Sequence, residues 1–128
     1  MEPLKQLIVL RLDNNQISKI KNLDSLKSLE YLHISENQIT KIQGLDNLLN
    51  LKRLSLNYNQ ISKIKNLGKC VNLEDINIEH NLITEVEGLK NLYKLRGISL
   101  EGNPFPYEEY GQNLNFESCE GDLPDRYP

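Results

Sequence analysis

The sequence predicts an α/β solenoid, a right-handed coil of short repeats with a parallel β-sheet on its concave side and short 3₁₀ or helical turns on its convex side. Two observations lead to this prediction. Apolar residues return every 22 residues along most of the 128-residue chain, and within each period a Leu-x-Leu alternation marks a short strand. A unit of this size cannot bury its own apolar side, whereas stacked units join their apolar side chains into one core.

The repeat is defined by residues that share one phase. Each unit follows the pattern L-x-x-L-x-x-L-x-L-x-x-N-x-I-x-x-I-x-x-L-x-x. The complete copies are 4–25, 26–47, 48–69 and 70–91, and an incomplete fifth copy covers 92–107. We therefore expect one repeat domain at 1–107, followed by an acidic C-terminal cap or tail at 108–128.

The first element of each unit is a strand, as the first copy illustrates. Leu10 and Leu12 alternate with Arg11, a two-residue period that turns the leucines inward and the residue between them outward. Equivalent strands of stacked units pair in parallel, about 4.8 Å apart. The sheet is therefore expected to run along the whole coil.

An Asn follows each strand where the chain turns away. Its amide both donates and accepts hydrogen bonds, so we expect it to satisfy backbone groups buried at the turn, each of which would otherwise cost about 1–3 kcal/mol. Beyond the Asn, the segment Ile-x-x-Ile-x-x-Leu has a three-residue period, which predicts 3₁₀-like turns on the convex side. The Asn ladder consists of Asn15, Asn37, Asn59, Asn81 and Asn103.

From Leu4 to Pro104, the chain resembles the leucine-rich repeat proteins of the 22-residue class. This class includes the protein phosphatase-1 regulatory subunit with leucine-rich repeats, the acidic nuclear phosphoproteins, the small nuclear ribonucleoprotein A-prime and axonemal dynein light chain one. The motif is specific for the fold and says little about function, because its members bind different partners. The resemblance implies an intracellular, non-enzymatic scaffold that binds a protein through its concave strand face.

Composition favours a reducing compartment. Two Cys residues and no Asn-x-Ser/Thr sequon favour the cytoplasm, with the nucleus as the other option. No apolar run approaches the roughly 20 residues that a membrane span needs, and the N-terminus shows no signal peptide. We therefore expect no membrane partner.

Charge is divided unevenly along the chain, although the formal net charge is only −3. Residues 1–69 carry 11 basic and 6 acidic side chains, whereas residues 70–128 carry 4 basic and 12 acidic ones. Such a dipole bears on association and steering and not on fold. It allows head-to-tail self-association as well as attraction to a charged partner.

The strand positions that face away from the core form columns on the concave sheet, and these columns hold the candidate partner-binding residues. Aromatic residues and Arg are enriched at interface cores and hot spots, and here they neighbour several polar and acidic positions. A solvated sheet face is the alternative interpretation; we favour a contact surface, because solenoids bind through their concave faces. The candidate site comprises Tyr31, His33, Arg53, Tyr58, Asp75, Asn77, Glu79 and His80.

The convex side carries a basic stripe, which supports a second hypothesis, an accessory protein of a nucleic-acid-associated complex. No aromatic side chains interleave with these lysines and no nucleic-acid motif is present, so a solvated face is favoured and nucleic acid is not the expected partner. The fourth repeat has Glu85 and Glu87 in the corresponding places. The stripe consists of Lys19, Lys41 and Lys63 in one column and Lys21 and Lys65 in the next.

Catalytic chemistry has little support in the sequence. His33 and Ser35 share a strand without the third group of a triad, and His33 and His80 fall two strands apart, about 10 Å, too far to share a metal. Cys70 replaces a repeat leucine and is interpreted as a small core residue, whereas Cys119 lies in the tail. We expect no enzymatic activity, no cofactor and no metal site.

The two ends of the coil differ. At the N-terminal end, the apolar run 7–10 falls on an edge strand, and such an edge invites pairing. The alternatives are a fragment of a longer protein, self-association through this edge, or a tolerated poor cap. At the C-terminal end, Pro104 and Pro106 stop the repeat, and we expect a helical turn at 107–110 and an extended segment at 123–128. A further alternative is a capping or folding segment of a larger multidomain protein.

Overall fold

The computed structural model describes residues 2–105 and 113–115 of the chain. The helical turn expected at 107–110, Cys119 and the extended segment expected at 123–128 lie outside the described residues. The described elements are the 3₁₀ helix η1 (Glu2–Gln6) and the strands β1 (Val9–Arg11), β2 (Tyr31–His33), β3 (Arg53–Ser55), β4 (Lys63–Ile64), β5 (Asp75–Asn77), β6 (Glu85–Val86), β7 (Gly97–Ser99) and β8 (Asn113–Asn115).

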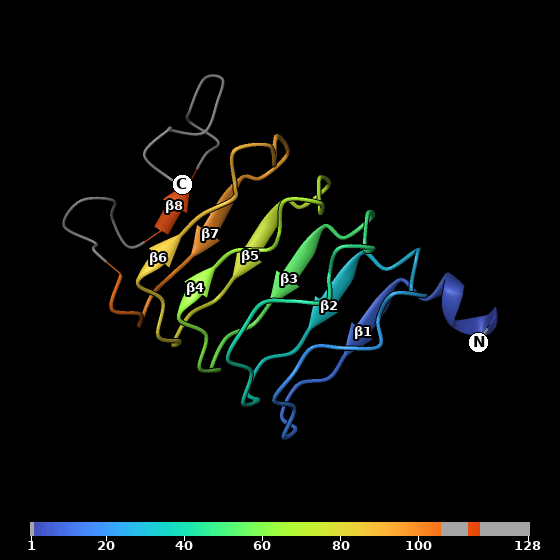
Figure 1. The fold of residues 1–128 in the computed structure, drawn as a ribbon, viewed down its shortest axis with the longest axis horizontal. Helices are drawn as coiled ribbons and strands as arrows, with labels where there is room; N and C mark the ends of the chain where they lie inside the picture. Colours follow the sequence, from blue (N-terminus) through green and yellow to red (C-terminus); the bar gives the residue numbers. More distant parts are fainter. Residues whose placement is uncertain (1, 106–112, 116–128) are drawn as a thin grey trace.

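Six strands form one sheet in the order β1-β2-β3-β5-β7-β8, and they lie side by side along the length of the molecule (Figure 1). The first five are parallel and pair with a shift of 22 residues, as in the row Leu10, Leu32 and Leu54. This is the stacked coil that the repeat predicts, and the solenoid fold is confirmed.

The core is the stack of repeat leucines and isoleucines inside the coil. Leu29, Leu51 and Leu73 are fully buried, and the central strand residues Leu32 and Leu54 are no more than 1% exposed. Burying a side chain of this size contributes about 1.5–3 kcal/mol. That burial needs a neighbouring coil on each side, so the coils stabilise one another rather than themselves.

The convex side differs from the expectation of 3₁₀ turns directly after the Asn. There the chain is extended, and in the third and fourth coils Lys63 pairs with Glu85 and Ile64 with Val86 in a second, two-stranded parallel sheet. The N–H and carbonyl groups of this extended backbone are satisfied because they form hydrogen bonds with the neighbouring coil. The Glu87 N–H, for example, donates to the Ile64 carbonyl at 2.8 Å.

Tight turns occur instead on the path that returns to the next strand. After the first strand, the Leu26 N–H donates to the Leu23 carbonyl at 3.0 Å, and the Leu29 N–H donates to the Leu26 carbonyl at 3.2 Å. Each bond closes a separate tight turn of four residues, and the two turns do not join into a 3₁₀ helix. The three-residue period of the repeat therefore does mark tight turns, but in the Leu-x-x-Leu-x-x-Leu part of the unit.

The two edges of the sheet are finished differently. At one edge, β8 pairs antiparallel with β7, an element that the repeat pattern did not predict. At the other edge, no strand of the described residues covers β1. There Leu10 and Leu12 are only partly buried, whereas their counterparts Leu32 and Ile34 are 0% and 1% exposed. The first coil therefore leaves part of the apolar core open.

Candidate interaction surface

A row of side chains crosses the concave face at the beginning of the strands. The register places Tyr31, Arg53 and Asp75 side by side on β2, β3 and β5. The guanidinium carbon of Arg53 lies 5.9 Å from the centroid of the Tyr31 ring, and Arg53 Nε lies 3.3 Å from Asp75 Oδ2. Arg96 Nη2 donates to the same oxygen at 3.2 Å. One carboxylate therefore holds two guanidinium groups.

Arg96 belongs to this row, although the strand columns in the sequence do not predict it. It precedes β7 by one position, and Gly97 is the residue that pairs with Asp75. Because Gly97 has no side chain, the space beside the carboxylate is left to its neighbour. The sequence does contain a hint of this contact, because Arg96 stands next to Gly97, the residue that follows Asp75 in its column.

A second group lies beyond the ends of the strands. The rings of Tyr58 and His80 stack with their centroids 4.5 Å apart and an angle of 13° between their planes. Both residues have positive φ, 58° and 54°, and Gly102 continues the column with φ 80°. A Cβ at Gly102 would overlap with the His80 ring. The ring therefore occupies space that only a glycine leaves free.

The candidate residues thus form two groups rather than one cluster. Arg53 and Tyr58 are five residues apart, which a fully extended chain at about 3.3 Å per residue would separate by at most about 16 Å. His33 and Asn77 lie between the groups, in the row at the end of β2 and β5, and Glu79 follows two residues after Asn77. In the first group, Arg53 contacts the Tyr31 ring and forms an ion pair with Asp75. In the second group, the Tyr58 and His80 rings stack on each other.

Four asparagines of the ladder are buried and link neighbouring coils. Asn59 Oδ1 accepts a hydrogen bond from the Ile39 N–H of the preceding coil at 3.0 Å. Its Nδ2 donates to the Ile34 carbonyl of that coil at 2.9 Å and to the Leu56 carbonyl of its own coil at 3.0 Å. The same bonds to the preceding coil are made by Asn37, Asn81 and Asn103.

Asn15, the first member of the ladder, has a different environment. It is exposed, and its Nδ2 donates to the Leu12 and Asp13 carbonyls of its own coil at 2.9 and 3.1 Å. In the other members, the N–H that bonds to Oδ1 lies in the preceding coil. In the part of the chain that the structure describes, no N–H donates to Asn15 Oδ1.

A second ladder on the return turns was not predicted. Asn50 Nδ2 donates to the Lys27 carbonyl at 2.9 Å, and Asn72 Nδ2 donates to the Leu49 carbonyl at 2.6 Å. Lys94 Nζ then donates to Asn72 Oδ1 at 2.8 Å. These donors are 22 residues apart, so the repeat period could have revealed them. In the sequence, however, they look like ordinary polar surface residues, and the structure leaves them exposed or half-buried.

The convex lysines lie on the back of the coil, and one of them has an acidic partner. Lys63 Nζ lies 3.5 Å from Glu85 Oε2, and both side chains are about half exposed. An exposed pair of this kind contributes only about 0–1 kcal/mol, but it neutralises the basic stripe at its junction with the fourth coil. Lys19 and Lys41 are exposed.

Among the described residues, two side chains have a pKa that departs from its ordinary value. Burial, reinforced by the nearby Asp46 charge, raises the pKa of the Cys70 thiol to about 11, and Cys70 Sγ donates to the Leu45 carbonyl at 3.4 Å. A hydrogen bond to Glu30 raises the pKa of Lys52. In the described part of the chain, no three His, Cys, Asp or Glu side chains gather as metal ligands, and no helix is long and apolar enough to cross a membrane.

Comparison with known proteins identifies the family. A family model described as leucine-rich repeats in two copies matches residues 5–47 and again residues 49–91. The chain belongs to the leucine-rich repeat family. Leucine-rich repeat domains are generally protein-interaction domains. The match does not separate the members of the 22-residue class, so the resemblance to the phosphatase regulatory subunit and its relatives stays a prediction.

Solved structures similar to this leucine-rich repeat chain include three internalins of Listeria monocytogenes. The internalin InlF is 31% identical with a TM-score of 0.72 over 78% of the chain, and internalin C2 is 39% identical with a TM-score of 0.69 over 73%. The functional domain of InlJ, which includes a cysteine ladder, shares the fold at 23% identity and a TM-score of 0.66 over 77%. The chain spans only 29%, 42% and 21% of these three structures. No curated protein shows a significant match.

Proposed function

We propose that this leucine-rich repeat chain is a non-enzymatic scaffold that binds a protein partner on the concave face of its sheet. The observation that carries the proposal is the row of Tyr31, Arg53, Asp75 and Arg96, which stands on the strand face of the solenoid. These side chains remain exposed or half-buried. They are positioned by contacts with one another, so the row presents a preformed surface to a partner.

The residue types in the row suit a contact surface. Tyr and Arg are the types that most often carry binding energy at protein interfaces. Arg53 is held between the Tyr31 ring and the Asp75 carboxylate, so part of its side-chain entropy is lost before a partner arrives. Immobilising such a side chain on binding costs about 0.5–1.5 kcal/mol, and the preformed contacts lower that cost.

The stacked pair of Tyr58 and His80 provides a second contact point for the same partner. Tyr58 is 54% exposed, and an aromatic ring offers a large apolar face together with a polar edge. The pair's separation of at most about 16 Å from the row at the strand starts is within the rise of about 11 helical residues. A partner helix of three turns, or a short extended segment lying along the strands, would reach both groups.

The alternative function, an accessory in a nucleic-acid-associated complex, would use the convex lysines. The ion pair of Lys63 with Glu85 reduces the charge available to phosphate, and phosphate contacts supply most of the affinity in such binding. Loss of salt-sensitive RNA binding on mutating Lys19, Lys41 and Lys63 would favour the alternative. A cytoplasmic location, proposed from the two cysteines and the missing sequon, suits either function.

Crosslinking followed by mutagenesis tests the concave-face proposal. A photo-crosslinking residue at Asn77, in the middle of the face, should capture a partner that the same residue at Tyr93, on the exposed return turn, does not. The affinity of the captured partner should then fall at least tenfold in the double variant Tyr31→Ala/Arg53→Ala. The control variant Tyr93→Ala/Lys69→Ala removes a tyrosine and a basic residue elsewhere and should bind normally. Equal affinity of the two double variants would show that the partner uses another surface.

A further inference from the structure

A polar hollow opens on the convex side of the solenoid, across the coil from the concave row. It has a volume of about 480 Å³, a size typical of pockets that hold small molecules. Its walls come from the second, third and fourth coils, so complete repeats bound it. Six of the residues that line it are Thr40, Lys41, Ser62, Lys63, Lys65 and Leu82.

The convex backbone is closed by hydrogen bonds between the third and fourth coils. There the Thr84 N–H donates to the Ser62 carbonyl at 3.0 Å. The Glu87 N–H donates to the Ile64 carbonyl at 2.8 Å. Both bonds run from an N–H group to the preceding coil. The repeat therefore points the N–H groups at these two positions toward the coil before them.

Between the second and third coils, the structure lacks these two bonds. The counterparts of the two donors, 22 residues earlier, are Ser62 and Lys65, and both line the hollow. In the described part of the chain, no acceptor meets the N–H of either residue. The carbonyl that the second bond would use, that of Ile42, accepts from Asn66 Nδ2 at 2.9 Å instead. Two backbone donors therefore border the hollow without a partner among the described residues.

Three lysine side chains make the hollow basic. Lys41 and Lys63 stand in one column on neighbouring coils, and Lys65 stands in the next column. Lys63 Nζ lies 3.5 Å from Glu85 Oε2. Within the described residues, no ion pair involves Lys41 or Lys65. An anion in the hollow would therefore meet two ammonium groups that no carboxylate neutralises.

The donors around the hollow suit phosphate. The two backbone N–H groups, the hydroxyls of Thr40 and Ser62 and the lysine ammonium groups all donate hydrogen bonds. Hydrogen bonds to a charged oxygen are about twice as strong as those between neutral groups. A chain of phosphate groups carries several charged oxygens, so it can use donors from both coils at once. A single carboxylate reaches fewer of them.

The fourth coil limits the length of the ligand. Leu82 forms the wall of the hollow there and is 54% exposed. Glu85 and Glu87 then take the places of the lysines in the two convex columns, and their carboxylates repel phosphate. A ligand confined to the hollow is therefore favoured over a polymer that continues along the convex side.

We propose that this convex hollow binds a small molecule that carries several phosphate groups. The phosphate oxygens accept hydrogen bonds from the N–H groups of Ser62 and Lys65, and the ammonium groups of Lys41 and Lys65 supply the positive charge. The hollow lies on the opposite side of the coil from the concave row. This binding therefore goes beyond the proposed scaffold function and does not depend on it.

A titration of the full chain with inorganic triphosphate, followed by amide nuclear magnetic resonance spectra, tests the proposal. We expect a Kd below about 1 mM. The amide protons of Ser62 and Lys65 should move to lower field, because a bond to a charged oxygen deshields them. Those of Thr84 and Glu87 are the internal control. They already donate to carbonyls and should stay in place.

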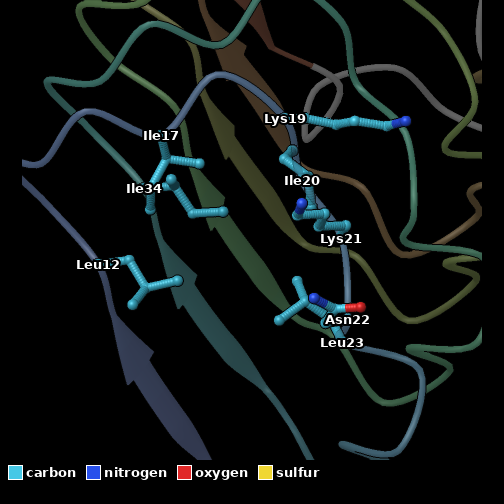
Figure 2. Close-up of a pocket in the computed structure, with 8 residues that line it drawn as sticks. All are labelled: Leu12, Ile17, Lys19, Ile20, Lys21, Asn22, Leu23 and Ile34. Atoms are coloured by element: carbon cyan, nitrogen blue, oxygen red, sulfur yellow. The ribbon is translucent and has the colours of Figure 1, made fainter.

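Two double variants separate the hollow from the lysine stripe as a whole. Lys41→Ala/Lys65→Ala should weaken triphosphate binding at least about tenfold, because it removes two charged donors. Lys19→Ala/Lys21→Ala removes the same residue types from the same two columns and should change the Kd less than about twofold. In Figure 2, the Lys19 side chain extends away from a smaller hollow of about 210 Å³ in the first coil. The walls of that hollow are mainly apolar and include Leu12, Ile17, Ile20, Leu23 and Ile34.

Three results would overturn the inference. Unchanged Ser62 and Lys65 amides at about 10 mM triphosphate would show that the hollow binds no phosphate. Equal weakening by the two double variants would show that the lysines attract anions without forming a site. Tighter binding of a 12-nucleotide oligouridylate than of triphosphate, in about 150 mM salt, would assign the lysines to a nucleic-acid strand.

Discussion

Replacing Asn59 with Leu separates the contribution of the hydrogen-bonding ladder from that of apolar burial. The site is 8% exposed, and Leu is the more apolar residue. The substitution removes the acceptor for the Ile39 N–H and the donor to the Ile34 carbonyl. The Leu56 carbonyl keeps a donor, because Asn81 Nδ2 also bonds to it at 2.9 Å. Two buried backbone groups in the preceding coil therefore lose their side-chain partner.

The magnitude follows from these two groups. Each buried backbone group left without a partner costs about 1–3 kcal/mol, and together they cost about 2–6 kcal/mol. Burying the leucine side chain returns about 2 kcal/mol. We therefore expect Asn59→Leu to lower the free energy of unfolding by about 2 kcal/mol, the midpoint of a range of about 0–4 kcal/mol, although it makes the core more apolar. A loss of this size is a large part of the stability of a small domain.

Urea denaturation followed by far-ultraviolet circular dichroism measures this loss. Asn15→Leu is the matched control, because Asn15 is exposed and its amide bonds to carbonyls of its own coil. That variant should change the free energy of unfolding by less than about 1 kcal/mol. If Asn59→Leu proves as stable as Asn15→Leu, the side-chain bonds of the ladder do not hold neighbouring coils together.

Two further predictions concern Gly102 and Cys70. Gly102→Ala should unfold more easily than Gly88→Ala. Both glycines have φ near 80°, but only the new Cβ at position 102 meets the His80 ring. Equal stability of the two variants, or unchanged His80 ring shifts in nuclear magnetic resonance spectra, would contradict this prediction. For Cys70, the pKa of about 11 in the folded chain lies above the reference value of 9.0. As the pH rises, the thiol therefore ionises first in the unfolded chain. The free energy of unfolding should fall by about 2–3 kcal/mol between pH 9 and 11. Urea titrations of a Cys119→Ser chain and of the same chain with Cys70→Ala measure this, and an equal fall in both would refute it.

Much of the fold could be predicted because contacts in a solenoid join residues at a fixed separation. Leu10, Leu32 and Leu54 pair at intervals of 22 residues, and the same interval identifies the Asn ladder. The strand columns of the concave face follow from the two-residue alternation alone. No knowledge of distant contacts was needed for any of these features.

The candidate site was less predictable, because columns give positions and not contacts. Long side chains lean along or across strands, and their direction depends on the space that neighbours leave. Arg96 reaches Asp75 where Gly97 leaves room, and the His80 ring stacks on Tyr58 where Gly102 leaves room. For this reason one expected cluster became two groups.

The sequence by itself determined the coil, its core and its ladder, since each rests on a local period that repeats without change. Only the tertiary structure decided the extended convex side and the strand β8. The convex backbone can be extended because adjacent coils satisfy its hydrogen bonds, and a single repeat does not contain that information. The ends break the period, so a repeat pattern cannot show what covers them.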